Sequence, residues 1–131
     1  MGAILVVDDD ESICSLIREI LAQEGHDCTI STEASEALDT IARGRYDLVI
    51  LDHNMPKMTG TDILLQVRAD PRFAQLPVVI LTADGLYLRK GEAGTAAGDP
   101  DGCLSKPVDR AKLVALVKTL SSRGAAQSRP R

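Results

Sequence analysis

Short, continuous apolar runs alternate along this chain with segments of helical periodicity, and this alternation limits the folds that it can adopt. Five runs indicate strands: Ile4–Val7, Cys28–Ile30, Leu48–Leu51, Val78–Leu81 and the weaker Gly102–Ser105. Apolar runs without polar alternation are typical of strands that are buried on both faces. Strands that alternate with helices form a parallel sheet covered on both sides, so we predict a (βα)5 doubly wound α/β domain.

The segments between the runs carry apolar residues at helical spacing. The first of them places five apolar residues on one stripe: Ile13, Leu16, Ile17, Ile20 and Leu21. Such a stripe predicts an amphipathic helix that packs on the sheet. Region 85–98 has a helical rhythm but contains four glycines, each costing roughly 1 kcal/mol relative to alanine inside a helix. We therefore expect a shortened or mobile fourth helix, and a last helix that begins behind Asp109 as its N-cap.

The charge of the chain is unevenly distributed. There are 15 basic and 19 acidic residues, and three of the arginines lie in the tail 122–131, so residues 1–122 carry 12 minus 19, or −7. An acidic body with 2% aromatic residues disfavours direct nucleic-acid binding, because it neither attracts phosphates nor stacks bases. The tail has no apolar face, so we expect it to be disordered and residues 1–121 to form the folded domain.

No apolar run is long enough to cross a membrane, and the N-terminal segment becomes acidic at position 8, so we predict neither membrane insertion nor a signal peptide. Three cysteines, Cys14, Cys28 and Cys103, are too few for a disulfide framework. Cys14 lies off the apolar stripe of its helix, and no thiol has a resolving partner in the sequence. These features predict a cytoplasmic protein, which we expect to be a monomer or a weak dimer.

Polar groups follow the predicted strands where each strand ends. They are Asp8, Asp9 and Asp10 after the first strand, Asp52 after the third, Thr82 after the fourth and Lys106 after the fifth. In a parallel sheet these ends meet at one edge. Carboxylates packed together repel one another and become tolerable with a cation, and a set of oxygen ligands favours magnesium. Taken singly, these residues have structural explanations as helix caps, turn residues, a strand end and a surface lysine, but those explanations are weak for all of them together.

Four segments resemble the receiver domains of bacterial response regulators: Ile4–Asp9 (ILVVDD), Asp47–Gly60 (DLVILDHNMPKMTG), Pro77–Ala83 (PVVILTA) and Ser105–Val108 (SKPV). The resemblance covers about residues 3–121. The spacings of 43 residues from Asp9 to Asp52 and 30 residues from Asp52 to Thr82 are ordinary for that family. The resemblance implies a flavodoxin-like sheet with strand order 2-1-3-4-5.

The resemblance also implies a role for each matching residue. Asp52 matches the phosphoacceptor. The metal, Mg²⁺ or Mn²⁺, would be bound by Asp9, Asp52 and the backbone carbonyl of Asn54, and by Asp8 through a water molecule. Both Mg²⁺ and the ammonium of a lysine would offset the charge repulsion that an attacking carboxylate meets at phosphorus.

The remaining matches concern the phosphoryl group. Thr82 and Lys106 would bind it, Asn54 and Asp84 would tune its hydrolysis, and Pro107 would follow a cis peptide bond. The chain departs from the family pattern at Cys103, which stands where a switch tyrosine or phenylalanine is usual. The spacing of 24 residues from Thr82 to Lys106 is also a little long. We therefore expect a non-standard output face.

Two kinds of residue have weaker claims to function. His26 and His53 are expected to be ordinary surface groups rather than phosphodonors. The segment 99–102 (DPDG) resembles half of a calcium loop, but the other ligands are missing, so we expect a turn.

The leading functional hypothesis is a single-domain response regulator, whose partners are a histidine kinase or histidine phosphotransfer protein and a downstream protein target. It would catalyse only its own phosphorylation and dephosphorylation, and so would not be an enzyme in the usual sense. A phosphorelay shuttle or phosphate sink is a close alternative, and a non-phosphorylated pseudo-receiver that only docks is another. An aspartyl phosphatase is disfavoured, because such enzymes carry a second aspartate where this chain has Asn54. The short polar tail suits a complete chain without an effector domain, and the alternative is a fragment of a larger regulator in which the tail is a linker.

Overall fold

The computed structural model describes residues 2–82 and 100–128, with side chains as far as Ser121. Its elements are β1 (Ala3–Val7), α1 (Glu11–Gln23), β2 (Asp27–Ser31), α2 (Ala34–Arg43), β3 (Leu48–Asp52), α3 (Gly60–Ala69), the short 3-10 helix η1 (Pro71–Phe73), β4 (Val78–Thr82), β5 (Gly102–Ser105) and α5 (Arg110–Ser128). The expected fourth helix and Asp84 lie outside the described residues. All five predicted strands are present.

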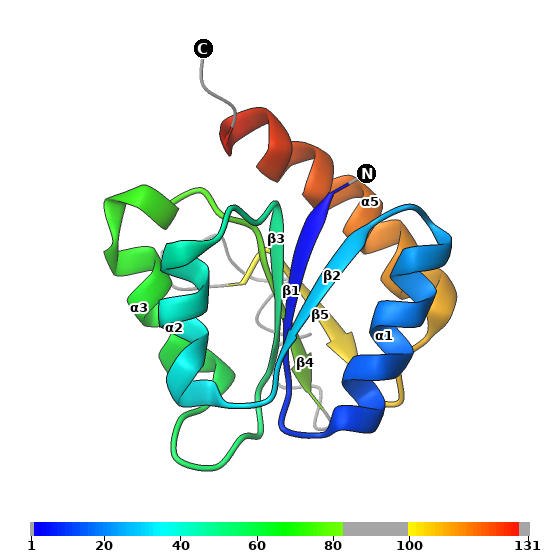
Figure 1. Ribbon diagram of the computed structural model, residues 1–131, viewed down its shortest axis with the longest axis horizontal. Coiled ribbons are helices and arrows are strands. Elements are labelled where there is room, and N and C mark those ends of the chain that lie inside the picture. Colours follow the sequence, from blue (N-terminus) through cyan, green and yellow to red (C-terminus); the bar gives the residue numbers. More distant parts are fainter. Residues whose placement is uncertain (1, 83–99, 129–131) are drawn as a thin grey trace.

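The five strands form one parallel sheet in the order β2-β1-β3-β4-β5. Helices α1 and α5 cover one face of it, and α2 and α3 cover the other (Figure 1). The predicted doubly wound α/β fold and its strand order are confirmed. The register aligns Val7 with Leu51, Asp52 with Leu81, and Thr82 with Ser105, so the strands end together at one edge.

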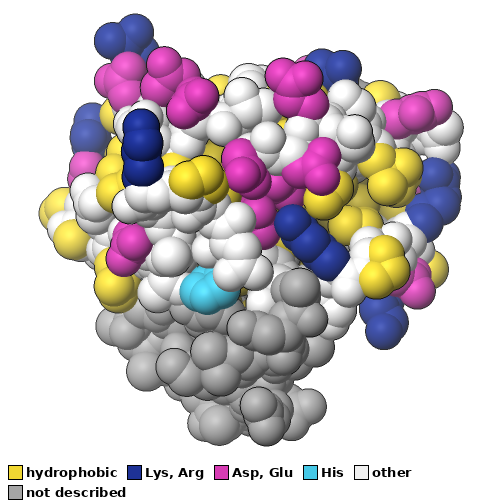
Figure 2. All heavy atoms as spheres, turned by 90° about the horizontal axis from the view of Figure 1, so that it is seen from below, with side chains coloured by type: hydrophobic (Ala, Val, Ile, Leu, Met, Phe, Trp, Pro, Cys, Tyr) yellow, Lys and Arg dark blue, Asp and Glu magenta, His cyan; other side chains and the backbone are white. Residues whose placement is uncertain are grey.

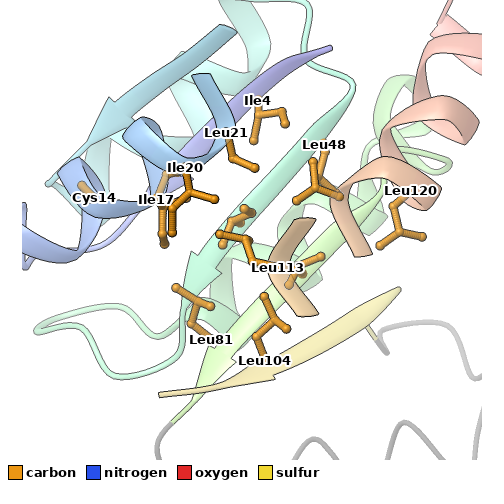
Figure 3. Packing of buried hydrophobic residues seen from close by; sticks show 14 residues of the cluster. Ile4, Cys14, Ile17, Ile20, Leu21, Leu48, Leu81, Leu104, Leu113 and Leu120 are labelled. Atoms are coloured by element: carbon orange, nitrogen blue, oxygen red, sulfur yellow. The ribbon is translucent and has the colours of Figure 1, made fainter. Parts of the chain in front are cut away.

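The sheet separates two apolar cores because alternate strand residues face opposite sides. Ile4 and Val6 of β1 face the α1 and α5 side, where α1 contributes Ile17 and Leu21 (Figure 3). Their neighbour Leu5 faces the α2 and α3 side. Each fully buried aliphatic side chain contributes about 1.5–3 kcal/mol, so this packing fixes the strand register firmly.

Helix α1 buries Ile17, Ile20 and Leu21 of the predicted stripe, but its buried face is shifted toward Cys14. Cys14 is fully buried with Ile17 and Leu21, whereas Leu16 is 47% exposed. The expectation that Cys14 lies off the apolar stripe is wrong, because positions 14, 17 and 21 also share a helix face and the small thiol packs closely against the sheet. Asp10 forms the N-cap of this helix by accepting hydrogen bonds from the backbone N–H groups of Ser12 and Ile13.

The turn before β5 is held by a carboxylate. Asp101 Oδ2 accepts hydrogen bonds from Arg68 Nη2 at 2.6 Å and from the backbone N–H of Val78 at 2.9 Å. Arg68 also donates to the carbonyl of Leu76 at 2.6 Å. The Asp101 carboxylate is therefore used inside the fold, while Asp99, the other carboxylate of the segment 99–102, lies outside the described residues.

Helix α5 begins behind Asp109, whose Oδ1 accepts a hydrogen bond from the backbone N–H of Lys112 at 3.1 Å. It continues to Ser128, so the expectation of a disordered tail does not hold for residues 122–128. A helix that packing has already nucleated extends at little cost through residues such as alanine and glutamine, even without an apolar face. Among the described helices, none is both long enough and apolar enough to cross a membrane.

Candidate functional site

Three acidic side chains and one lysine meet at the edge where the strands end. Asp8 follows β1, Asp52 ends β3, and Lys106 follows β5, so the sheet register brings them together. Lys106 Nζ lies 3.0 Å from Asp52 Oδ1 and 3.2 Å from Asp8 Oδ2. Figure 2 looks onto this edge and shows acidic side chains gathered there with a basic side chain beside them. The predicted convergence of Asp8, Asp9, Asp52 and Lys106 is therefore present.

The carboxylates form a compact set of oxygen atoms. One oxygen from each of Asp8, Asp9 and Asp52 lies within 4.8 Å of the others. Asp8 is fully buried, Asp52 is 2% exposed, and Asp9 is exposed. Asp8 Oδ1 accepts a hydrogen bond from the backbone N–H of Asp10 at 2.9 Å. Asp8 Oδ2 is buried without a hydrogen-bond donor among the described residues, although it faces the Lys106 ammonium.

This arrangement fits a divalent cation with oxygen ligands. Three carboxylates share one ammonium, so their negative charge is only partly compensated, and a divalent cation would offset the remainder. The donor set consists of oxygen atoms alone, which Mg²⁺ and Mn²⁺ prefer. The exposed Asp9 leaves the set open on one side, so the set can share a cation with a further oxygen-rich ligand.

The pKa values of Asp8 and Lys106 are each shifted by burial and by neighbouring charges. Burial raises the pKa of Asp8 above its ordinary value, and the nearby Asp52 charge adds to the rise, while the Asp10 N–H and Lys106 lower it. Burial alone would lower the pKa of Lys106, but its hydrogen bond to Asp52 and the two negative charges raise it. Lys106 therefore stays charged and acts as the cation of the site.

Thr82 ends β4 and Lys106 follows β5, so both residues lie at the same edge of the sheet. Thr82 is fully buried at the end of β4, and its carbonyl accepts a hydrogen bond from the backbone N–H of Lys106 at 3.0 Å. The Lys106–Pro107 peptide bond is cis, which is the geometry that the resemblance implied. This backbone hydrogen bond between Thr82 and Lys106 thus places the predicted hydroxyl and ammonium groups at adjacent strand ends.

The loop between β3 and α3 wraps around Asp52. The backbone N–H of Asn54 donates to Asp52 Oδ1 at 3.3 Å, and Asn54 is itself exposed. Gly60, the first residue of α3, packs on the Asp52 backbone so closely that a Cβ there would lie 2.6 Å from the Asp52 carbonyl oxygen. His53 Nδ1 lies 3.3 Å from the Thr61 hydroxyl, so its ring contacts the first turn of α3.

Cys103 lies three residues before Lys106, in β5. It is half-buried and packs against the core on the α2 and α3 side, whereas the next residue, Leu104, packs into the opposite core. A small thiol therefore occupies the position where the family pattern has a ring. Burial raises the pKa of the other two thiols, to about 12 for Cys14 and about 11 for Cys28, so they are protonated at neutral pH.

Two supporting residues were missed by the sequence analysis. The Cys14 thiol donates to the Asp8 carbonyl at 3.3 Å, and the Ser31 carbonyl accepts a hydrogen bond from the Asp8 backbone N–H at 3.1 Å. The spacing of Cys14 from Ile17 and Leu21 is the signal that could have found the first. The direct contact of Asp8 with Lys106 had no signal in the sequence, because the two residues lie far apart in the chain.

The fold and this edge define a flavodoxin-like α/β protein with an acidic site that a lysine partly neutralises. The family model for the response regulator receiver domain matches residues 4–118. The chain therefore belongs to the response regulator receiver domain family of two-component systems.

Individual relatives agree with this assignment. The transcriptional regulatory protein CpxR of Escherichia coli K12 is 37% identical over 123 residues, covering 94% of this chain and 50% of CpxR. The crystallised Vibrio cholerae chemotaxis protein CheY4 superposes with a TM-score of 0.80 at 29% identity, covering 92% of this chain and 98% of that one. The chain spans about half the length of the curated relatives it matches.

A second solved structure shows the fold alone, because its sequence is 24% identical. It is the receiver domain of the Pseudomonas aeruginosa sensor histidine kinase PA1611, described with a magnesium ion coordinated in its active-site cleft. Its TM-score is 0.79, and the match covers 92% of this chain and 98% of that one.

Proposed function

We propose that Asp52 accepts a phosphoryl group from a histidine kinase or histidine phosphotransfer protein, and that the phosphorylated chain signals by binding a downstream protein. One observation carries the proposal. The Lys106 ammonium stands 3.0 Å from Asp52 Oδ1 in a buried site that also holds Asp8 and Asp9. A carboxylate held beside a fixed ammonium and two further carboxylates is suited to attack a phosphoryl group shared with a cation.

The cation would be Mg²⁺, with Mn²⁺ able to replace it. Asp9, Asp52 and the backbone carbonyl of Asn54 would bind it, and Asp8 would bind one of its water molecules. When bound, Mg²⁺ supplies positive charge to the equatorial oxygens of the phosphoryl group during transfer. The excess of three carboxylates over one ammonium at this edge supports this assignment.

In the transfer step, an oxygen of Asp52 bonds to phosphorus as the phosphorus–nitrogen bond to the donor histidine breaks, and the imidazole leaves with the bonding electron pair. Lys106 can then move its ammonium from the carboxylates to a phosphoryl oxygen, and Thr82 donates its hydroxyl to another. The product is an acyl phosphate, which water can hydrolyse. Asn54 and Asp84 would tune that hydrolysis. The chain would thus catalyse its own phosphorylation and dephosphorylation only.

The output would be a change in protein binding. The acidic body of the chain argues against direct contact with nucleic acid. Cys103 cannot swing a ring between two positions, so the signal would reach the binding face by another route than the usual aromatic switch.

The test is the intact mass of the full chain after incubation with acetyl phosphate, with and without Mg²⁺. We expect one phosphoryl adduct that requires Mg²⁺ and that Asp52→Asn abolishes. Asp27→Asn, which removes an exposed carboxylate at the start of β2, is the matched control and keeps the adduct. An adduct on Asp52→Asn would place the acceptor elsewhere. Bound Mg²⁺ without any adduct, followed by no transfer from a phosphorylated histidine kinase, would leave only a docking role.

A further inference from the structure

A hollow of about 360 Å³ adjoins the site on the side of α2. We call it the acidic hollow. Three of its lining residues are acidic, namely Asp9, Glu11 and Glu33. Three more are apolar, namely Ala34, Met55 and Pro56. They come from the loops after β1, β2 and β3 and from the first residues of α1 and α2. Because Asp9 also belongs to the carboxylate set of the site, the acidic hollow is continuous with the place where Asp52 would react.

Two of the carboxylates in the acidic hollow make no side-chain contact that ties them to the rest of the described chain. The Glu11 and Glu33 side chains are exposed, and neither makes a hydrogen bond or ion pair with another residue of the described part of the chain. Glu33 occupies the N-cap position of α2, yet its side chain makes no capping hydrogen bond. Among the described residues of the lining, Lys57 is the one basic side chain against three carboxylates, so this lining is negative overall.

The burial of Asp52 and the negative charge of the acidic hollow indicate which kind of ligand the hollow would bind. Asp52 is 2% exposed, so a donor protein that reaches it must cover the edge of the sheet and, with it, the acidic hollow. A lysine or arginine side chain would place its charge beside Glu11 and Glu33 and its apolar stem on Ala34 and Met55. We propose that the acidic hollow receives a basic side chain of the phosphodonor protein. This inference rests on the proposed function of Asp52.

The same charge would act against small donors. Acetyl phosphate is an anion, and Glu11 and Glu33 would lower its concentration near the site at low ionic strength. The acidic hollow would therefore make the chain favour a protein donor with a basic residue next to its histidine over small acyl phosphates.

The first experiment needs no phosphoryl chemistry. The ¹⁵N-labelled full chain is titrated with N-acetylargininamide in saturating Mg²⁺ at low ionic strength, and with uncharged N-acetylglutaminamide as the control ligand. We expect saturable shifts of the Thr32, Ala34 and Met55 amides with the arginine compound alone. Glu11→Gln and Glu33→Gln should each weaken binding about three- to tenfold, by the loss of one attractive charge.

Glu36→Gln is the matched control, since Glu36 is exposed one turn further along α2 and does not line the acidic hollow. It should bind the arginine compound as the unchanged chain does. The proposal is overturned if the amide shifts do not saturate, or if Glu36→Gln weakens binding as much as Glu33→Gln.

The second experiment measures the initial rate of phosphorylation by acetyl phosphate. The Glu11→Gln/Glu33→Gln double variant should react about two- to fivefold faster at low ionic strength, and the gain should vanish in about 0.5 M salt. An unchanged rate would refute the discrimination against small donors. If the unchanged chain bound arginine but took no phosphoryl group from any donor, the proposed function would fail, and the donor role of the acidic hollow with it.

Discussion

Lys106 is the cation that makes two buried carboxylates tolerable, and replacing it by methionine tests that reasoning. In Lys106→Met, Asp8 and Asp52 would remain buried at 0% and 2% exposure without their ammonium partner. Methionine keeps much of the lysine stem and its packing, so the change removes mainly the charge. We expect the variant to be folded but less stable in the absence of divalent cations.

The magnitude follows from the two contacts. At an effective dielectric constant of about 20, attractions over 3.0 Å and 3.2 Å are each roughly 5 kcal/mol before desolvation. Burying the ammonium offsets several kcal/mol of this, and Lys106 keeps 21% of its side chain exposed. Breaking a buried pair by removing one partner typically costs about 3–5 kcal/mol, and the partial exposure reduces our expectation to about 2–3 kcal/mol.

The assay is urea denaturation of the full chain and the variant, with EDTA and with excess Mg²⁺. Lys112→Met, at an exposed position of α5, is the matched control and should change stability by less than about 0.5 kcal/mol. Mg²⁺ should stabilise Lys106→Met more than the unchanged chain, because the cation would replace the missing charge. Equal stability of Lys106→Met and Lys112→Met in EDTA would refute the reasoning.

Three further predictions concern the fold around the site. Arg68→Met and Asp101→Asn should each lower the free energy of unfolding, measured by urea denaturation. A double-mutant cycle should give a coupling energy between the two side chains of about 1–3 kcal/mol. If the two losses are additive, the 2.6 Å contact contributes nothing to stability. Burial lowers the pKa of His26, so the stability of the chain should fall as the pH drops below the pKa of the unfolded state, near 6.5. His26→Gln should lose less stability over that pH range when the urea midpoints are compared. Curves of urea midpoint against pH that run parallel for the two proteins would contradict this. Cys14 and Cys28 should react slowly with a thiol reagent at pH 8 in the folded chain and rapidly in urea, with the labelled cysteine located by peptide mass. Rapid labelling of either cysteine in the folded chain would show that its raised pKa and burial do not protect it.

Much of the fold could be predicted because the strands are buried on both faces. The run Ile4–Val7 lies within β1, and Val78–Leu81 lies within β4, each differing from the observed strand by one residue at one end. Helix α1 was harder, because its apolar residues allow two overlapping stripes. Packing against the sheet selects the stripe with Cys14 and leaves Leu16 exposed, and no local rule distinguishes them.

The site was predictable to the extent that strand ends determine it. The groups after β1, β3, β4 and β5 meet at one edge because parallel strands in register must end there. The pairing within that edge was not predictable: Lys106 contacts Asp8 as well as Asp52, and the Cys14 thiol supports the Asp8 backbone. Such contacts depend on side-chain reach across the sheet, which spacing in the chain does not encode.

The acidic edge is the part of this chain that opposes folding, and the two cores make it possible. Burial raises the pKa of Asp8, which means that the folded chain holds this carboxylate in a less favourable environment than water does. A slip of one residue in β3 would turn Asp52 toward the other face of the sheet and relieve the repulsion, but it would also move Leu48 and Ile50 out of the core in which they pack and into the opposite one. Each core is packed around the side chains that it holds, so such a swap would create cavities and overpacking, and this packing keeps the observed register. The packing of the cores therefore holds the three carboxylates close to one another, with the Lys106 ammonium beside Asp8 and Asp52.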